Sequence, residues 1–350
     1  MTKMIRGLPQ RDRAGKSFYT SNGYTYELHQ DYGNLPNCFE FTMYSGGCCD
    51  KEDNLFLSSR DSNHPIIMLD PDGNYVKDFG KDLFNETHTL CVTPQDTLLC
   101  VDVANHVLRE LTKEGHLIRD IGNLGIPSDS GFDPNIWRKR QRIGKYVPTD
   151  VSFDKGWAFF MGLETIKRAA PPFNKPTGVA FSASGEMFVS DGYGNAAIHR
   201  FSKDMQLINT WGGPGDEPGK FVVPHCICVD SLERVWVGDR DGNRVHIFSK
   251  EGELLAYFDE NLYQPTGLWA DSRYVYVAER GGGITIINMD LTVVSQLGFY
   301  NSSIRAHGMC GNSKGELFLM PLTTYDRHFL MKLSPVKVPE KENFKKETTH

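Results

Sequence analysis

Short hydrophobic runs alternate with polar turn sequences along most of the chain. Runs of about four to six residues rich in Val, Ile, Phe and Tyr are separated by segments such as SASGE, DGYGN, DRDGN and KEGE. Gly, Asp, Asn and Ser favour tight turns, whereas β-branched and aromatic residues favour strands. The pattern therefore predicts antiparallel β-structure and no long helix.

The predicted strands recur as one unit with a spacing of about forty residues. Three consecutive copies are the clearest, and they begin at Lys175, Val223 and Gln264. Each copy predicts four strands, which make one antiparallel blade. Three more degenerate copies contain the segments YSGGCCDKEDNLFLSS, ETHTLCVTPQDTLLCVD and RAHGMCGNSKGELFLM. The predicted fold class is therefore all-β, a six-bladed β-propeller with four-stranded antiparallel blades.

The repeat also sets the domain boundaries. The propeller is expected to span residues 17–335, after an N-terminal extension at 1–16 and before a disordered Lys- and Glu-rich tail at 336–350. The last copy lacks a convincing fourth strand, and the N-terminal segment SFYTSNGYTYELHQDYG has strand character without a blade of its own. This strand is expected to complete the last blade and close the ring, which protects exposed sheet edges.

One long segment, residues 123–172, interrupts the repeat between the second and third copies. An insertion of that length in a compact fold is usually functional, so a lid over the site is one interpretation. The basic cluster from Trp137 to Arg142 within it suits an anionic ligand, although a solvated basic face is the simpler interpretation.

Charge and composition narrow the class of partner. The 350 residues carry a formal net charge of -6, which gives no general attraction to nucleic acid or to anionic membranes. No run of roughly eighteen apolar residues occurs, and the first residues, MTKMIRGLPQ, carry charge where a secretory signal would be apolar. We therefore expect a cytoplasmic protein with reduced cysteines and a small-molecule partner.

Residues at the same position of each repeat copy form a column of the repeat alignment. In a propeller, the residues of one column lie on a ring around the axis, so their relative positions can be predicted. The column at the start of the innermost strands reads Ser45, His88, Thr177, His225, Thr266 and His307. Histidine thus alternates with small hydroxyl residues, and alternate blades are one third of a turn apart. Three imidazoles so placed converge on the axis and leave coordination positions open, as in catalytic zinc sites.

This column predicts a metal ion bound by His88, His225 and His307. The alternative is three unrelated structural histidines, but 11 histidines in 350 residues rarely alternate by chance. Zinc is the favoured ion because it prefers nitrogen ligands, while iron, copper and cobalt also bind imidazole.

A second column stands where the second strand returns to the same end of each blade. It contains Arg60, Arg240 and Arg280, and guanidinium groups near a metal predict an anionic substrate such as a carboxylate. Arginines in surface turns are the alternative. Tyr193 stands beside this column. Its pKa is about 10 when unperturbed, so it becomes a base only if a metal or a guanidinium stabilises the phenolate.

Three further columns are expected to be structural. Packing residues between blades are Cys48, Cys91, Cys228 and Cys310. Aspartates that bond turns are Asp102, Asp191 and Asp239. Histidines expected on exposed faces of outer strands are His199 and His246.

The segments KPTGVAF, VSDGYGN, FVVPHCICV and VGDRDGNRV resemble NHL-repeat propellers, and most closely the peptidyl-α-hydroxyglycine α-amidating lyases. The resemblance covers nearly all six predicted blades. Lyases of this family cleave an N-acylated α-hydroxyglycine to an amide and glyoxylate, with zinc on three histidines, a tyrosine base and arginines. The resemblance implies that the metal ligands are His88, His225 and His307, and that the catalytic residues are Tyr193, Arg60 and Arg240.

Three positions depart from the family pattern. Gly308 stands where the family has an aspartate that holds a structural calcium with two backbone carbonyls, here those of Gly47 and Leu90. The resemblance therefore does not supply a complete calcium site. Arg305 replaces an apolar methionine near the substrate, and Arg280 is an additional cation. Both are candidate substrate-binding residues, and they favour a different anionic substrate.

The leading hypothesis is a metal-dependent lyase that breaks the C–N bond of a small anionic carbinolamide and releases an amide or a urea plus an oxo acid. The first alternative is a metal-dependent hydrolase such as a lactonase on the same scaffold. The second is a non-enzymatic NHL propeller that binds a protein or RNA partner, and the negative net charge weakens its RNA version.

Overall fold

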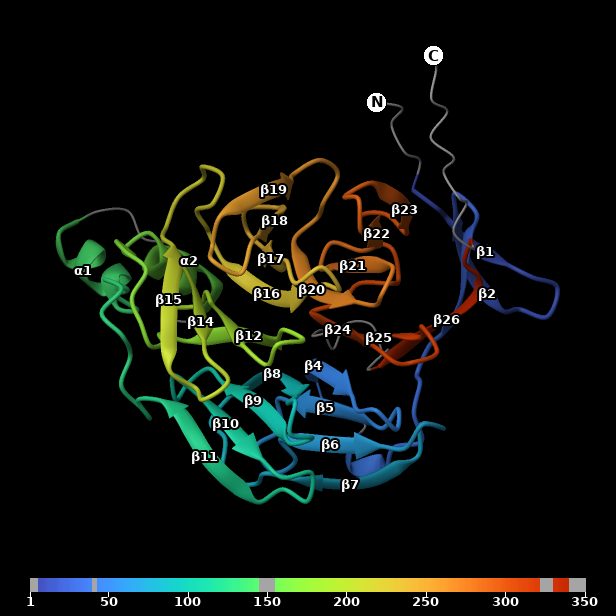
Figure 1. Cartoon of the computed structure of the whole chain (residues 1–350), viewed down its shortest axis with the longest axis horizontal. Coiled ribbons are helices and arrows are strands. Elements are labelled where there is room, and N and C mark those ends of the chain that lie inside the picture. Colours follow the sequence, from blue (N-terminus) through green and yellow to red (C-terminus); the bar gives the residue numbers. More distant parts are fainter. Residues whose placement is uncertain (1–5, 40–42, 145–154, 322–329, 340–350) are drawn as a thin grey trace, which may run out of the picture.

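Six antiparallel β-sheets form a closed ring in the computed structural model (Figure 1). The structure describes residues 6–39, 43–144, 155–321 and 330–339. Each sheet is one blade, and the first strand of each copy contacts the first strands of the neighbouring blades around the axis. The predicted six-bladed β-propeller is confirmed.

Five blades consist of four consecutive strands each. The strands of blades one and two are β4 (Tyr44–Cys49), β5 (Leu55–Ser59), β6 (Ile66–Leu69), β7 (Tyr75–Phe79), β8 (Thr87–Val92), β9 (Leu98–Asp102), β10 (Val107–Leu111) and β11 (Leu117–Gly122). The strands of blades three to five are β12 (Pro176–Phe181), β13 (Met187–Asp191), β14 (Ala197–Phe201), β15 (Leu207–Gly212), β16 (Pro224–Val229), β17 (Val235–Asp239), β18 (Arg244–Phe248), β19 (Leu254–Phe258), β20 (Pro265–Ala270), β21 (Tyr274–Glu279), β22 (Ile284–Asn288) and β23 (Val293–Leu297).

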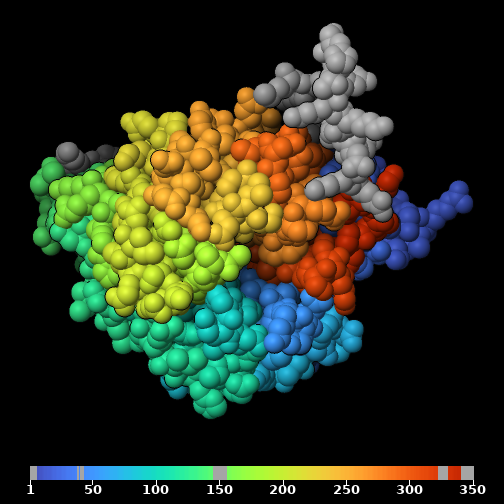
Figure 2. All heavy atoms as spheres, viewed as in Figure 1, coloured from blue at the N-terminus to red at the C-terminus, as the bar shows by residue number. Residues whose placement is uncertain are grey.

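Blade six joins the two ends of the chain. Its strands, in sheet order, are β24 (Gly308–Gly311), β25 (Leu317–Met320), β26 (Met331–Lys337), β3 (Tyr24–His29), β2 (Ser17–Ser21) and β1 (Pro9–Arg11). The N-terminal strand β3 pairs antiparallel with β26 and supplies the missing fourth strand, as the sequence predicts. Strands β2 and β1 extend this sheet further, and the N-terminal segment projects from the rim of the ring (Figures 1 and 2).

Hydrophobic side chains fill the spaces between successive blades. Each of six buried clusters draws its residues mainly from two neighbouring blades. The column predicted to pack between blades contributes to every cluster, through Cys48, Cys91, Ala180, Cys228, Trp269 and Cys310. Burial of one large apolar side chain contributes about 1.5–3 kcal/mol, so these clusters hold the ring together.

The aspartate column bonds turns, as predicted. Asp102 accepts backbone N–H groups of Asn85 and Glu86, and Asp239 accepts those of Val222 and Val223. Each carboxylate therefore fixes the loop that leads into the innermost strand of its own blade.

Blade five varies this arrangement of the buried carboxylates. Glu279 takes the place of the aspartate and accepts the backbone N–H of Tyr263. Its guanidinium partner is Arg6 of the N-terminal segment, at 3.0 Å, whereas Asp239 pairs with Arg244 of its own blade.

The prediction that His199 and His246 lie on exposed faces is wrong, because both side chains are fully buried. Their strands, β14 and β18, are covered on one edge by β15 and β19 and lie against neighbouring aromatic rings. Nδ1 of His199 lies 2.9 Å from the Thr210 hydroxyl, whereas neither ring nitrogen of His246 has a hydrogen-bond partner among the described residues.

Both α-helices of the described chain lie in the segment between blades two and three. They are α1 (Ile136–Arg142) and α2 (Lys155–Leu163), and residues 145–154 between them lie outside the described residues. Helix α1 contains no buried residue, and its Lys139 and Arg140 form exposed ion pairs with acidic residues, which fits the simpler interpretation of a solvated basic face. Neither helix is long and apolar enough to cross a bilayer.

A short 3-10 helix, η1 (Asn37–Phe39), precedes blade one. The tail predicted to be disordered lies mostly outside the described residues, which end at residue 339.

Candidate metal centre

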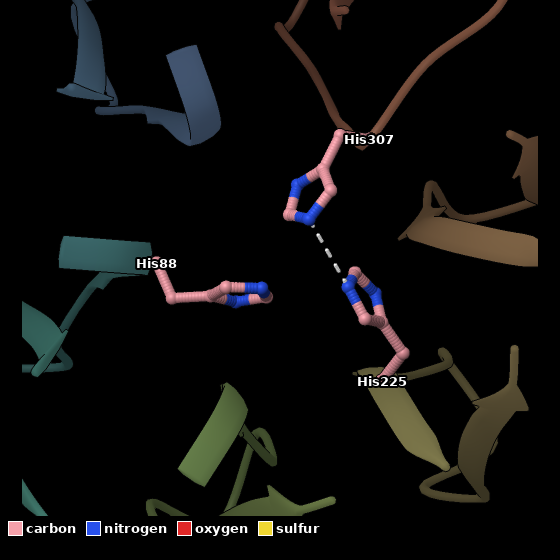
Figure 3. A group of neighbouring side chains, drawn as sticks. All are labelled: His88, His225 and His307. Atoms are coloured by element: carbon pink, nitrogen blue, oxygen red, sulfur yellow. Dashed lines mark hydrogen bonds between the residues drawn. The ribbon is translucent and has the colours of Figure 1, made fainter. Parts of the chain in front are cut away.

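The histidine column forms one compact cluster on the propeller axis. The side chains of His88, His225 and His307 point toward one another from blades two, four and six (Figure 3). Their ligand nitrogens all lie within 4.8 Å of one another, and all three side chains are buried. Rotational symmetry therefore brings together residues that are far apart in the sequence.

A break in strand pairing aims His88 and His225 at the axis. In blade four, pairing with the second strand shifts between Pro224 and Cys226, so His225 occupies a bulge. The same shift leaves His88 unpaired in blade two, and it recurs in three hydroxyl blades. A β-bulge re-aims the side chain that it carries, which explains why this column faces the channel.

Backbone carbonyls fix the orientation of each imidazole. The Nδ1 atoms lie 2.6, 3.1 and 2.8 Å from the carbonyl oxygens of Thr177, Thr266 and Ser45, for His88, His225 and His307 respectively. A carbonyl only accepts, so each Nδ1 carries the proton and donates it. Each Nε2 is therefore left with a lone pair directed at the axis.

The converging lone pairs suit a metal ion. The Nε2 atoms of His225 and His307 approach to 3.3 Å, the contact dashed in Figure 3, and neither carries a proton if Nδ1 is the donor. That separation is close to the edge of a tetrahedron whose centre lies about 2.0 Å from each nitrogen, the usual zinc distance. The three imidazole nitrogens are a donor set that fits a divalent transition metal, and the pair from His225 and His307 has the spacing of such a site.

Protonation is a poor alternative source of positive charge in this cluster. Burial is the main cause that lowers the pKa of His88 and His225 well below its usual range, and it lowers that of His307 to about 3. The nearby guanidinium of Arg240 lowers all three further. At neutral pH the imidazoles are therefore neutral and available as ligands.

Tyr193 directs its hydroxyl into the middle of the cluster. Its oxygen lies 3.0, 2.8 and 3.5 Å from the Nε2 atoms of His88, His225 and His307. Gly192 permits this approach, because a Cβ there would lie 2.2 Å from the Pro224 carbonyl oxygen of blade four. Burial raises the pKa of the Tyr193 hydroxyl, whereas Arg240 and Arg60 act to lower it.

Two of the predicted arginines lie beside this hydroxyl or the imidazoles, and each has an acidic partner. Arg240 is 5% exposed, donates to the Tyr193 oxygen at 3.1 Å and pairs with Asp241 at 2.7 Å. Arg60 pairs with Glu86, and its charge acts on His88, His307 and Tyr193.

The two predicted substrate-binding arginines lie nearer the solvent. Arg280 is exposed, its charge lowers the pKa of His307, and its side chain has no ion-pair partner among the described residues. Arg305 is half-buried, two residues before His307. Arg280 is therefore the better placed of the two to bind an anionic group.

Beyond the imidazoles the channel narrows to a cavity of about 40 Å³ lined by the innermost strands. None of the described residues that line it is acidic. A Cβ at Gly308 would lie 2.6 Å from the Ser45 carbonyl oxygen, so the close packing leaves no room there for an aspartate. The described part of the channel thus supports the expectation that the calcium ligand set is incomplete.

Sequence reasoning missed three contributors to this site. Glu86 and Asp241 are acidic partners of the two arginines, and neither belongs to a column of the repeat. The third is Phe159 of α2, whose ring centroid lies 5.5 Å from that of Tyr193. The length of the insertion was the available signal, but its sequence shows no periodicity that identifies the contacting residue.

Comparisons with known proteins agree with this architecture. Residues 221–248 match the NHL repeat. The chain is 34% identical over 165 residues to mouse NHL repeat-containing protein 3, and the matched region covers 43% of this chain and 47% of that protein. It is 27% identical over 236 residues to Drosophila melanogaster peptidyl-alpha-hydroxyglycine alpha-amidating lyase 1, covering 64% of this chain and 36% of that enzyme.

A third relative is rat peptidylglycine alpha-amidating monooxygenase, with 29% identity over 195 residues, 53% of this chain and 16% of that protein. The matched regions thus span less than half the length of these curated relatives. The predicted resemblance to NHL propellers and amidating lyases is confirmed at this distant level.

Solved structures share the fold at lower identity. A virginiamycin B lyase from Staphylococcus aureus has a TM-score of 0.56 and 13% identity, covering 88% of this chain and 99% of that one. A gluconolactonase from Xanthomonas campestris has a TM-score of 0.54 and 14% identity, covering 89% and 90%. At such identity these likenesses show the propeller fold alone.

Proposed function

We propose that this protein is a metal-dependent lyase that cleaves the C–N bond of an N-acyl or N-carbamoyl α-hydroxyglycine-like carbinolamide. The products are an amide or a urea plus glyoxylate or a related oxo acid. The observation that carries the proposal is the convergence of three unprotonated imidazole nitrogens on the Tyr193 hydroxyl, with Arg240 bonded to the same oxygen. The distant amidating-lyase relatives support the same reaction class.

The three histidines would hold the metal, and zinc is the ion we favour. A divalent ion bound there supplies Lewis acidity toward a substrate hydroxyl and a positive charge that favours the phenolate form of Tyr193. The carbonyl partners of the Nδ1 atoms keep the ligand nitrogens aimed at the axis and raise their basicity.

Tyr193 acts as the general base. Its phenolate takes the proton of the carbinol hydroxyl, the C–O bond becomes a carbonyl, and the electrons of the C–N bond leave with nitrogen. The leaving nitrogen then takes this proton back from the Tyr193 phenol, so the phenolate is restored, no water is consumed and the atoms balance. Arg240 donates to the phenol oxygen at 3.1 Å, and this contact favours the charged form of the base.

The remaining cations orient the substrate carboxylate. Arg60 is partly neutralised by Glu86, whereas Arg280 is exposed and has no ion-pair partner among the described residues. We therefore assign the carboxylate mainly to Arg280, with Arg60 and Arg305 alongside. The net charge of -6 gives no general attraction to nucleic acid or to an anionic membrane, so the arginines at the site carry the argument for a small anionic substrate.

The direct test is to mix the purified protein with α-hydroxyhippurate and measure glyoxylate. We expect release that depends on a bound divalent metal and that is lost in His225→Ala. Absence of metal-dependent glyoxylate above the uncatalysed rate would exclude this substrate class.

Elemental analysis separates the lyase from its alternatives. About one tightly held transition metal ion per chain is expected for the lyase, since three imidazole nitrogens are a known donor set for catalytic zinc. Calcium in its place would favour a lactonase, and no metal at all would favour a propeller that only binds a partner.

A further inference from the structure

The insertion between blades two and three places an aromatic surface beside the candidate site. Phe159 of α2 meets the Tyr193 ring edge-on, with ring centroids 5.5 Å apart. The guanidinium of Arg240 lies over both rings, 5.9 Å from the centroid of Phe159 and 5.3 Å from that of Tyr193. A residue that no repeat contains therefore contacts both the proposed base and its cationic partner.

Helix α2 is anchored to the propeller, so this surface has a defined position. Its Met161 and Gly162 are buried, and a Cβ at Gly162 would lie 2.7 Å from the Phe132 ring. Just beyond the helix, Ile166 packs into the hydrophobic cluster between blades three and four. The Ser130 hydroxyl of the same insertion donates to the Gly194 carbonyl, at 2.5 Å, next to Tyr193.

Ring contacts lead from Tyr193 through Phe159 to Phe160, which reaches the solvent. The ring of Phe160 lies 5.5 Å from that of Phe159, and its side chain is 46% exposed. Neither side chain carries a hydrogen-bonding group. A polar carbamoyl group placed against them would lose hydrogen bonds to water without replacement, whereas an apolar acyl group would gain from burial.

The charges around the site give the substrate a direction. Arg280 belongs to blade five, whereas Tyr193 and α2 lie beside blade three. An α-hydroxyglycine carries its carboxylate and its acylated nitrogen on the same carbon, so the two substituents extend in different directions. With the carboxylate on the arginines, the acyl group has the aromatic surface of α2 available to it.

Resting on the proposed lyase activity, we propose that Phe159 and Phe160 of α2 form the binding surface for an apolar N-acyl group. The protein then selects N-acyl α-hydroxyglycines with aromatic or long aliphatic acyl groups over N-acetyl and N-carbamoyl substrates. Phe159 also acts as a positioning residue for Tyr193 and Arg240. Phe160 touches neither of them and serves specificity alone.

The test compares kcat/KM for three substrates: α-hydroxyhippurate, N-acetyl-α-hydroxyglycine and ureidoglycolate. We expect the wild type to prefer the benzoyl substrate by about tenfold or more, the effect of burying part of one ring. Phe160→Ser should lower the benzoyl-to-acetyl ratio about fivefold. The matched control is Leu255→Ser on the outer strand β19, where a 51% exposed apolar side chain is removed and the ratio should stay the same.

The outcomes distinguish this inference from the function on which it rests. Glyoxylate release with no benzoyl preference, with a preference for ureidoglycolate, or with a ratio that Phe160→Ser leaves unchanged would overturn the inference and leave the lyase intact. If none of the three substrates yields glyoxylate, the proposed function fails and the inference fails with it. Circular dichroism of both variants checks that the propeller is folded.

Discussion

Three blades place a histidine on the axis, and the other three place a hydroxyl residue there. All six are antiparallel sheets, but the two sets contribute different chemical groups to the candidate site. The hydroxyl blades hold Ser45, Thr177 and Thr266 at the positions where the other three hold histidine. The backbone carbonyl of each of these residues accepts a hydrogen bond from the Nδ1–H group of a histidine. Each also donates its hydroxyl to the residue that precedes the next histidine, namely Thr87, Pro224 and Ala306.

The hydrogen bonds therefore run around the axis through all six blades. The comparison teaches that half of the ring supplies the converging imidazoles and the other half orients them, so neither set explains the site alone. Metal ligands depend on such second partners for their orientation and their tautomer.

Removal of one ligand should produce the largest effect. In His225→Ala the cluster loses one of three nitrogens, so we expect bound metal to fall to a small fraction and kcat/KM to fall about a thousandfold or more. Metal content by elemental analysis and glyoxylate release measure the two losses. His116→Ala, an exposed histidine in a turn of blade two, is the matched control and should retain both.

Removal of the central hydroxyl separates metal binding from chemistry. Tyr193→Phe keeps the ring contacts with Phe159 and the imidazoles but removes the oxygen between the Nε2 atoms. We expect kcat to fall about a hundredfold to a thousandfold with full metal content. Tyr19→Phe removes a buried hydroxyl bonded to Ser303 elsewhere and should leave kcat unchanged. Loss of metal in Tyr193→Phe would instead make the phenol a ligand.

Burial also changes the pKa of a histidine outside the ring, His246. Burial, with a contribution from nearby Arg244, lowers the pKa of His246 to about 4, and its ring nitrogens have no hydrogen-bond partner among the described residues. Between pH 6.5 and 4 the unfolded chain binds a proton that the folded protein excludes, so the free energy of unfolding falls as the pH is lowered. The loss amounts to about 3 kcal/mol and is complete below the folded pKa.

His246→Phe should remove this part of the pH dependence, because the side chain already packs against Phe221 and Phe248. Urea unfolding of the wild type and the variant at pH 7.5 and pH 4 measures it. Parallel pH profiles for the two proteins would show that His246 is not buried in its neutral form.

The smallest expected effect tests the hydroxyl blades. In Thr266→Val the Ala306 carbonyl loses the hydroxyl group that donates to it. The backbone carbonyl of residue 266, which accepts a hydrogen bond from His225, remains. We expect metal affinity to fall about tenfold, measured by competition with a chelator, and stability to change little. Thr210→Val, which removes a hydroxyl that bonds His199 outside the ring, should leave the affinity as it is. Equal metal affinities of the wild type and Thr266→Val would show that the hydroxyl group of this blade does not contribute to metal binding.

The sequence predicted the fold and the convergence of the three histidines, because each position in the repeat has a fixed angular place around the axis. Once His88, His225 and His307 share a column, rotation alone brings them together, and no side-chain detail is needed. The aspartate and cysteine columns were interpreted correctly for the same reason.

The parts that the sequence did not predict belong to no column. The burial of His199 and His246 depends on which face of a twisted outer strand meets the next blade, which strand alternation alone does not specify. Phe159 reaches Tyr193 through an insertion whose path depends on packing against blades three and four. Glu86 and Asp241 neutralise the arginines from loops. The repeat does not determine where a loop side chain points relative to the axis.

The pairing of β3 with β26 has a consequence for how the protein is made. Strand β3 cannot complete its sheet until β26 has been synthesised, after the strands of all the other blades, so the nascent ring stays open with two unprotected edges. His307 also lies in this last blade. The three imidazole nitrogens therefore meet only when the ring closes, so an ion held by all three would bind only after that step.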